Sequence, residues 1–381
     1  MQFEMNGASS AGSPVVFGHV GSSTPETTAS FPNPARETSF PVVLRRRLHD
    51  FFIVRGLSPK ADPVMIAKLI VGLSAWAGSY AALYVFHLRS WIFVLVYLLH
   101  GLTHVFLLLN IAHDSNHNAI SRRIPVNKTF SYVFDLCGVS SYVWRILHHG
   151  GHHSCINVHG EDEAIEGRRL FRFSSRAPRK RAHRYQHIYA LLMYCLFSLD
   201  YVFIKDFEYF FFPSQRTLRR DGHPAREYAI LFGGKLFYLT YMLVLPVVVL
   251  GLSPLLVAFA FLLEHLIAGL TTVIVFQTSH AVETSYFPES RAEFDNYVFH
   301  ILATTSDYAT RNPVVTFLVG GLNHHVAHHL CPYACHTHYP QLTKIIRETA
   351  EEYRMPYREQ RTMGKALRLH LALLKGLGSP S

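Results

Sequence analysis

The chain alternates between long apolar runs and polar segments, and four of the runs are long enough to cross a bilayer. A helix needs about 20 apolar residues to span a hydrocarbon core of ~30 Å. The apolar runs extend from Met65 to His87, from Trp91 to Ala112, from Ile230 to Leu252 and from Pro254 to Phe276. The pattern predicts an all-α integral membrane protein with four transmembrane helices.

The connections inside the two pairs of runs are very short. Residues 88–90 join the first pair, and Ser253 marks the break in the second. Each pair is therefore expected to form a hairpin, so that every other segment lies on one side of the membrane. A helical period that begins near Tyr339 predicts that this side carries a helical cap.

A fifth apolar run, from Ile188 to Ile204, contains Asp200. A carboxylate near the middle of a spanning helix costs roughly 2.5 to 3.5 kcal/mol on insertion scales. A fifth crossing would also place the histidines after residue 277 across the membrane from those before residue 154. We predict that this run is an interfacial or partly embedded helix.

The two ends of the chain differ from this central part. Residues 1–41 are rich in Ser, Thr, Gly and Pro without a hydrophobic period, which predicts a disordered tail and no cleavable signal peptide. The basic, amphipathic stretch from Val42 to Val54 is expected to lie among lipid headgroups. Residues 42–360 are expected to form one membrane domain, and residues 361–381 a C-terminal tail.

Composition agrees with a membrane location and suggests which side is which. Hydrophobic residues make up 49% of the chain and charged residues 16%, against roughly 25% charged in a soluble domain. The net charge of +10 comes largely from Lys and Arg outside the apolar runs, for example Arg122, Arg123 and Lys128. The positive-inside rule then places this side in the cytoplasm, and no nucleic-acid partner is needed to explain the charge. The five cysteines include no Cys-x-x-Cys pair and indicate no disulfide framework.

Histidine is unusually abundant, with 25 residues, and three clusters follow the ends of predicted spans or lie on the same side. Histidines four apart share one face of a helix, and adjacent histidines differ by about 100° and can face two metals. His280, just beyond the fourth run, adds one more candidate. The first cluster can supply two ligands, the second three, His280 one and the third three. Nine ligands are too many for one metal ion, so the sequence predicts two ions. The candidates are His113, His117, His148, His149, His152, His153, His280, His325, His328 and His329.

The choice of metal follows from the setting of the clusters. Imidazole binds Zn, Cu, Fe and Ni alike. A site at the membrane boundary can admit a hydrocarbon chain, and removing hydrogen from an unactivated carbon needs redox chemistry, which zinc does not perform. Soluble di-iron bundles use carboxylate ligands, of which the clusters contain few. An all-histidine pair of iron ions that reacts with dioxygen is the hypothesis that fits best.

The three clusters resemble the histidine boxes of membrane fatty acid desaturases. The pattern His-x3-His, then His-x2-or-3-His-His, then His-x2-His-His carries the resemblance, and Gln277 to His280 resembles the element that supplies an extra histidine. Residues 141–145, 320–323 and 336–340 are similar to the bacterial linoleoyl-CoA or acyl-lipid desaturase-like branch. The similarity extends from about residue 42 to about residue 360.

The resemblance implies O2-dependent desaturation of a fatty acyl chain carried by CoA, acyl carrier protein or a lipid. It implies two Fe ions held by the candidate histidines, with either His148 or His149 as the ligand from that pair. It also implies a multi-pass protein of the bacterial inner membrane, supplied with electrons by a ferredoxin or by a b-type cytochrome with its reductase. The third box has His325 where related enzymes often have Gln, and Ala327 where an acidic residue is common. An acetylenase, a hydroxylase, or an alkane or carotenoid oxygenase therefore stays an alternative.

Two other classes of protein predict different features. A metal transporter should carry its ligands at mid-membrane, whereas the clusters lie beyond the span ends. A zinc-dependent hydrolase should contain zinc and act without oxygen.

His104 is about 13 Å along a helix from His113, which is too far for the two to bind one metal ion. We therefore expect His104, like His100 and His265, to make buried hydrogen bonds instead. Candidate hydrogen-bond partners for the metal ligands are His159, His183, His187, His300, His336, His338, Asp114, Asn116, Asn157 and Asp162.

Overall fold

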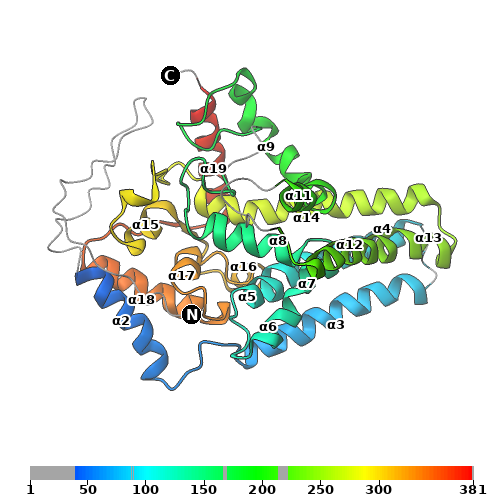
Figure 1. Cartoon of the computed structure of the whole chain (residues 1–381), viewed down its shortest axis with the longest axis horizontal. Helices are drawn as coiled ribbons and strands as arrows, with labels where there is room; N and C mark the ends of the chain where they lie inside the picture. Colours follow the sequence, from blue (N-terminus) through cyan, green and yellow to red (C-terminus); the bar gives the residue numbers. More distant parts are fainter. Residues whose placement is uncertain (1–38, 87, 89, 166–169, 213–221, 380–381) are drawn as a thin grey trace.

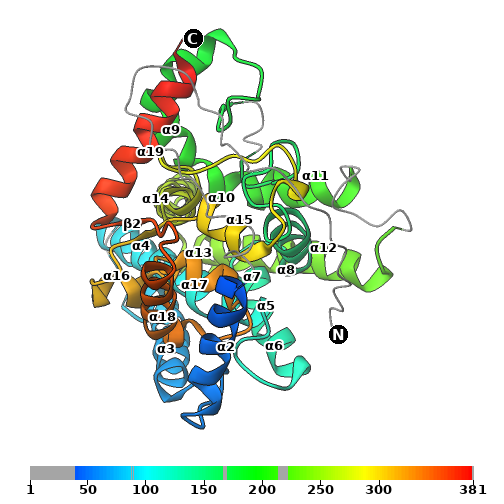
Figure 2. The ribbon, with the colours of Figure 1, turned by 90° about the vertical axis from the view of Figure 1, so that its left-hand side faces the viewer.

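The computed structural model describes residues 39–86, 88, 90–165, 170–212 and 222–379. In Figure 1 the long helices run side by side along the horizontal axis, and a group of shorter helices closes one end of them. Figure 2 looks along these helices from the capped end. The predicted disordered tail lies outside the described residues except for residues 39–41, which begin the first described helix.

Four helices within the described residues are long and apolar enough to cross a membrane, which confirms the predicted spans. The second and third of them change pitch along their length. The spans are α3 (Pro63–Val85); α4 (Ser90–Leu107) continued by the π-helix η1 (Leu108–Ala112) and α5 (His113–Asn116); α12 (Ala225–Leu239) continued by the π-helix η6 (Thr240–Val244) and α13 (Leu245–Leu250); and α14 (Pro254–His280).

Local sequence sets where these helices begin and end. The Asp62 side chain accepts a hydrogen bond from the Met65 backbone N–H at 2.8 Å, and Pro63 occupies the first helical position, so α3 begins there. Gly251 takes a left-handed conformation, with φ of 64°, and ends α13. Because α14 begins at Pro254, the second hairpin has a turn of only a few residues.

A buried polar network joins the spans and confirms the hydrogen-bonding role predicted for the intramembrane histidines. His104 Nδ1 lies 3.0 Å from Glu264 Oε1, and its Nε2 lies 3.1 Å from the Tyr241 hydroxyl. His265 contacts the hydroxyls of Tyr238 and Ser198 at 3.0 and 2.9 Å. In the bilayer such groups must find partners inside the protein, so the network fixes how α4, α12 and α14 pack.

We predict that Gly101→Ala destabilises the bundle because a Cβ atom at Gly101 would overlap the Glu264 side chain. Overpacking of this kind typically costs about 1 to 3 kcal/mol. Gly78 lies in α3, and nothing lies within 4 Å of the position that a Cβ atom would take there, so Gly78→Ala is the matched control. Thermal unfolding in detergent should show a lower midpoint for Gly101→Ala alone, and equal midpoints for the two variants would contradict the packing argument.

The fifth apolar run forms a bent helix rather than a straight one. Its parts are η4 (Arg181–Tyr185), α9 (Gln186–Cys195), α10 (Phe197–Asp200), η5 (Tyr201–Lys205) and α11 (Asp206–Phe211). The two halves meet at an angle of 60° near Leu196. Ile188, Leu192 and Phe203 are exposed, which suits contact with lipid, and α9 runs across the direction of the bundle in Figure 1.

The cap is built from helices on both sides of the third histidine cluster. These are α2 (Ser39–Ile53), α15 (Tyr297–Thr304), α17 (His325–Leu330) and α18 (Tyr339–Glu352). The helix predicted from Tyr339 is confirmed as α18. The apolar face of α2 is covered by protein: Leu44, Leu48 and Phe52 are at most 6% exposed and pack in one core with α15 and α18. The location of residues 42–54 among headgroups stays a prediction.

The remaining elements, short except for α19, connect the spans to the cap or follow the cap in the chain. They are α6 (Ile124–Ser131), α7 (Val133–Leu136), α8 (Ser141–Arg145), the π-helix η2 (Ile146–His152), η7 (Arg291–Glu293), β1 (Asp307–Tyr308), α16 (Pro313–Leu318), η8 (His336–His338), β2 (Glu359–Gln360) and α19 (Met363–Gly378). The two strands pair in parallel, with Asp307 opposite Glu359. The segment expected as a C-terminal tail contains α19, which packs on α9 and α14.

Acidification should weaken the docking of α19 through His370. This side chain is buried, its Nε2 lies 2.7 Å from the Tyr194 hydroxyl, and its Nδ1 lies 2.6 Å from the Ala281 carbonyl oxygen. Burial lowers the pKa of His370 to about 4, against about 6.5 in an unfolded chain. Between pH 4 and pH 6.5 the unfolded state therefore binds more protons than the folded state, so the free energy of unfolding decreases as the pH falls. The stability that His370 contributes above pH 6.5 is lost by pH 4, and this loss is about 3 kcal/mol at most. His370→Asn should flatten the fall in melting temperature between pH 7.5 and 5, and an unchanged slope would count against His370 as a contributor.

Candidate metal centre

Nine histidines converge where α5, α14, α17 and η2 meet, between the spans and the cap. Their nitrogens form groups in which the atoms lie within 4.8 Å of one another. One set contains His113, His117, His148 and His328, and a second set contains His152, His280, His325 and His329. His153 lies between the sets and groups with His328 and His329. All nine are among the ten candidates from the sequence, and His149 is the tenth.

The first histidine cluster is carried by the end of the second span. The π-helix η1 directly precedes α5, so His113 and His117 begin and end a short helical turn with ring centroids 4.9 Å apart. Gly320, with φ of 62°, packs against the backbone of Leu109 in this π-helix, where a Cβ would collide. The irregular pitch and the close loop together set the direction in which His113 leaves the bundle.

The second cluster lies on the π-helix η2, and this pitch decides which histidines face each other. The His153 N–H donates to the His148 carbonyl at 2.8 Å, a hydrogen bond between residues five apart. His148 Nε2 is consequently 3.0 Å from His153 Nε2 and 2.9 Å from His117 Nε2. His149 points differently and stacks on the His117 ring, with centroids 4.5 Å apart.

The third cluster and His280 complete the second set. His280 ends α14, and its Nε2 lies 3.2 Å from His152 Nε2 and 3.1 Å from His329 Nε2. The ring centroid of His325 is 4.6 Å from that of His280. The helix α17 that carries this cluster begins where the buried Asp307 carboxylate accepts the Val326 backbone N–H at 2.8 Å.

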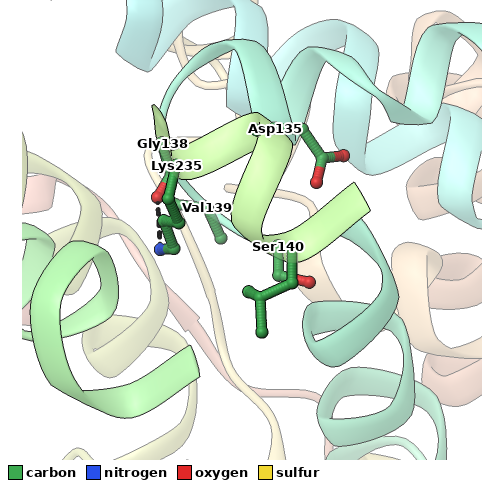
Figure 3. Close-up of a pocket in the computed structure, with 7 residues that line it drawn as sticks. Asp135, Gly138, Val139, Ser140 and Lys235 are labelled. Carbon is green, nitrogen blue, oxygen red and sulfur yellow. Dashed lines mark hydrogen bonds between the residues drawn. The ribbon is translucent and has the colours of Figure 1, made fainter. Parts of the chain in front are cut away.

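A buried charged cluster anchors the start of the helix that leads into η2. Figure 3 shows one part of it, the hydrogen bond of Lys235 to Gly138 beside Ser140. Lys235 of α12 donates to the Gly138 carbonyl at 2.7 Å and contacts Asp206 Oδ2 at 2.6 Å. The same carboxylate oxygen accepts the Ser140 backbone N–H at 2.7 Å, immediately before α8. The third span is thereby tied to the second histidine cluster.

The arrangement of the nine imidazoles suits metal ions. Nitrogens bound at ~2.1 Å to one ion lie roughly 3 Å from their neighbours around it, and the observed Nε2–Nε2 distances are 2.9 to 3.2 Å. Among the ten candidate histidines, the ring nitrogens buried without a hydrogen-bond partner are both nitrogens of His113, the Nε2 atoms of His149 and His325, and the Nδ1 atoms of His280 and His329. A buried nitrogen without a partner is costly unless a cation or a donor completes its environment.

Burial also keeps four of these imidazoles in the neutral form that binds metals. Desolvation lowers the pKa of His325 to about 3. It also lowers the pKa values of His153, His328 and His329, and the charges of neighbouring histidines lower them further. Neutral rings keep a free lone pair at physiological pH, as ligation requires.

Several rings are oriented by an acceptor on their Nδ1 side, which turns Nε2 toward the other histidines. His152 Nδ1 lies 3.0 Å from Asp162 Oδ1, and His325 Nδ1 lies 2.8 Å from the Leu322 carbonyl oxygen. His328 Nδ1 lies 3.2 Å from the Tyr339 hydroxyl. The Asp162 carboxylate also accepts the Asn157 and Ala164 backbone N–H groups, both at 2.8 Å, and is thereby held in place.

The predicted partners of the ligands divide into two groups. Asp162 contacts a cluster histidine directly, and Asp114 binds His336, as described below. The other candidates make different contacts. Asn157 donates to the backbone carbonyls of His280, Tyr286 and Thr304, and His300 contacts the Ile156 carbonyl. The roles of Tyr339 and Asp307 were not predicted, since neither has a sequence pattern that points to a histidine far along the chain.

Comparison with known proteins gives one family and several relatives. The family described as "Fatty acid desaturase" matches residues 89–361, which is more than half of the chain. An acyl-lipid (8-3)-desaturase of Physcomitrium patens is 31% identical over 348 residues, covering 90% of this chain and 72% of the relative.

Two further relatives are matched over nearly their whole length. An sn-1 linoleoyl-lipid 6-desaturase of Arthrospira platensis is 31% identical, covering 87% of this chain and 90% of the relative. A protein of the same name from Synechocystis sp. is 32% identical, covering 91% and 97%. The family match over residues 89–361 contains the three histidine clusters and the second, third and fourth spans.

Proposed function

Because the chain belongs to the fatty acid desaturase family, we propose that it introduces a double bond into the acyl chain of a membrane lipid at a pair of iron ions held by nine histidines. The observation that carries this proposal is the convergence of those nine imidazoles at the ends of two long apolar helices. The relatives named above act on acyl lipids, which favours a lipid over a CoA or carrier-protein substrate for this chain.

We assign one iron to each set of four histidines. His113, His117, His148 and His328 would hold the first ion, and His152, His280, His325 and His329 the second. His153 is close to both sets and would complete the coordination of one of them. His149 is left out of the ligand set because its ring stacks on His117 instead of facing the other nitrogens. Zinc is a poorer candidate because this reaction requires redox chemistry.

When bound, the iron ions would supply the oxidation by which dioxygen, two electrons and two protons convert a –CH2–CH2– unit to –CH=CH– with release of two waters. The residues of the chain position the reactants and exclude water. His113, His280 and His325 are at most 2% exposed, so these ligands are shielded from bulk solvent. Asp162 and the Leu322 carbonyl orient His152 and His325 through their Nδ1 atoms, which leaves Nε2 as the ligand atom.

The location of the site suggests how substrate and electrons reach it. α5 and α14 leave the membrane beside the histidines, so an acyl chain can approach from lipid without crossing water. The segment between α5 and α6 carries Arg122 and Arg123, and by the positive-inside rule this end faces the cytoplasm. We propose that an external donor, a ferredoxin or a b-type cytochrome with its reductase, supplies the electrons there.

Expression in a host of simple lipid composition, with lipid analysis and metal analysis of the purified protein, tests the proposal. We expect about two irons per chain and a new acyl species lighter by two hydrogens, formed only with oxygen and a reductase system. A hydroxylated or acetylenic product would favour the alternative outcomes that His325 and Ala327 leave open. Stoichiometric zinc, or protein without iron, would contradict the proposed site.

A further inference from the structure

A chain of buried polar contacts leads from the first span to the first histidine cluster. Lys68 of α3 is 4% exposed, and its ammonium group donates to the Phe317 carbonyl at 2.9 Å. The same nitrogen lies 2.8 Å from Nε2 of His336. His336 Nδ1 lies 2.8 Å from Asp114 Oδ2, and the His336 backbone N–H donates to that oxygen at 3.0 Å.

The direction of these hydrogen bonds is fixed by the first and last groups in the series, the Lys68 ammonium group and the Asp114 carboxylate. A lysine ammonium group can only donate, so His336 Nε2 must accept. The Nδ1 atom of His336 then carries the proton and donates to the Asp114 carboxylate. The tautomer of His336 follows from its neighbours, and both of its ring nitrogens are in use.

The other oxygen of Asp114 faces a ligand of the proposed metal site. Oδ1 is buried without a hydrogen bond, and it lies 3.7 Å from Nδ1 of His113, which also has none. Beyond this edge the His113 ring adjoins His328, with centroids 4.6 Å apart. His113 thus has the carboxylate on one side and the histidine cluster on the other.

The same residues do not form a further metal site, although Asp114, Cys335 and His336 each place a possible ligand atom within 4.8 Å of the others. A cation there would need a nitrogen of His336, and both are engaged. It would also lie close to the buried Lys68 ammonium group, whose positive charge repels it.

We propose that Lys68, His336 and Asp114 form a positioning relay that holds His113 with its Nδ1 proton toward Asp114 and its Nε2 lone pair toward the first iron. This inference rests on the proposed function, since it assigns a role toward the metal ligand. Partners of this kind fix ring orientation and increase ligand basicity, and their loss typically weakens metal binding 10- to 100-fold. The relay couples α3 and the segment after the third cluster to one half of the site.

The relay can be tested by iron retention in Lys68→Met and His336→Asn. The first variant removes the ammonium group at similar side-chain length. The second variant keeps a donor that can reach Asp114 but breaks the link to Lys68. It still tests the relay if Lys68→Met fails to fold. Tyr97→Phe is the control, because it deletes one buried hydrogen bond in the same bundle, 2.8 Å from the Met242 carbonyl, without touching the relay.

Each purified protein would be loaded with 57Fe, followed by Mössbauer spectroscopy and by the rate of iron loss to a ferrous chelator. We expect one of the two irons to be lost at least tenfold faster in both relay variants, with altered spectral parameters for that iron alone, and wild-type behaviour in Tyr97→Phe. Wild-type rates and spectra in the relay variants, or equal loosening of both irons, would overturn the relay. Failure of the wild-type protein to bind iron would instead refute the proposed function.

Discussion

Replacing His148 by alanine should abolish desaturation, whereas replacing the adjacent His149 should leave most of it intact. His148 Nε2 lies within 3.0 Å of the Nε2 atoms of His117 and His153, whereas His149 stacks on His117 and is not part of either set of four. Losing even an outer partner of a metal ligand costs 10- to 100-fold, so losing the ligand itself should cost more than about a hundredfold. For His149→Ala we expect a change of no more than about threefold.

The two variants are matched controls for each other, because they delete the same side chain at neighbouring positions of one π-helix. Product formed per chain should be measured beside iron content, with about one iron lost from His148→Ala and none from His149→Ala. The reverse order of effects would assign the ligand to His149 and refute the geometric argument. Equal losses in both variants would show that the π-helix as a whole, rather than one ring, supports the site.

The sequence was sufficient to predict the spans and the grouping of nine of the ten candidate histidines. Four apolar runs of suitable length have few alternatives in a helical protein, and the bounds of α14 differ from the prediction only in extending to His280. The histidine clusters could be identified because histidine is costly to bury without a role. Because each hairpin crosses the membrane twice, the sequence predicts that all the clusters lie on one side of it. The structure brings nine of the ten candidates together.

The choice between His148 and His149 could not be made from the sequence because it depends on helical pitch. On an α-helix, His149 and His153 are four apart and would share a face. On the observed π-helix, residues five apart align, so His148 faces His153 instead. The pattern of apolar residues does not distinguish these two pitches over so short a segment.

The buried carboxylates that support the clusters were also beyond sequence reasoning. Asp307 and Asp206 lie 19 and 66 residues from the backbone groups they bind, Val326 and Ser140. Neither is next to a histidine, and a single aspartate has no period to reveal it. Similarly, α2 looks like a surface-active helix in isolation, because the protein core that covers its apolar face is formed by residues near the other end of the chain.

The second large effect is expected from Lys235→Met, which would leave Asp206 buried without its cation. Both side chains are at most 7% exposed, and the Nζ–Oδ2 distance is 2.6 Å. Removing one partner of such a pair typically costs about 3 to 5 kcal/mol, because the remaining charge stays desolvated. Lys235 also donates to the carbonyls of Gly138 and Tyr201, so its loss removes the contacts that join α12 to the bent helix.

The double variant Lys235→Met/Asp206→Leu separates the charge penalty from the lost packing. Replacing both partners by apolar residues removes the unpaired charge, so we expect the double variant to regain part of the stability lost by Lys235→Met. Unfolding midpoints in detergent would measure this, with activity as a second readout because the Asp206 carboxylate also binds the Ser140 N–H before the second histidine cluster. A double variant that is less stable than the wild type by the sum of the costs of Lys235→Met and Asp206→Leu measured singly would show that the two residues act independently, against the geometry of the pair.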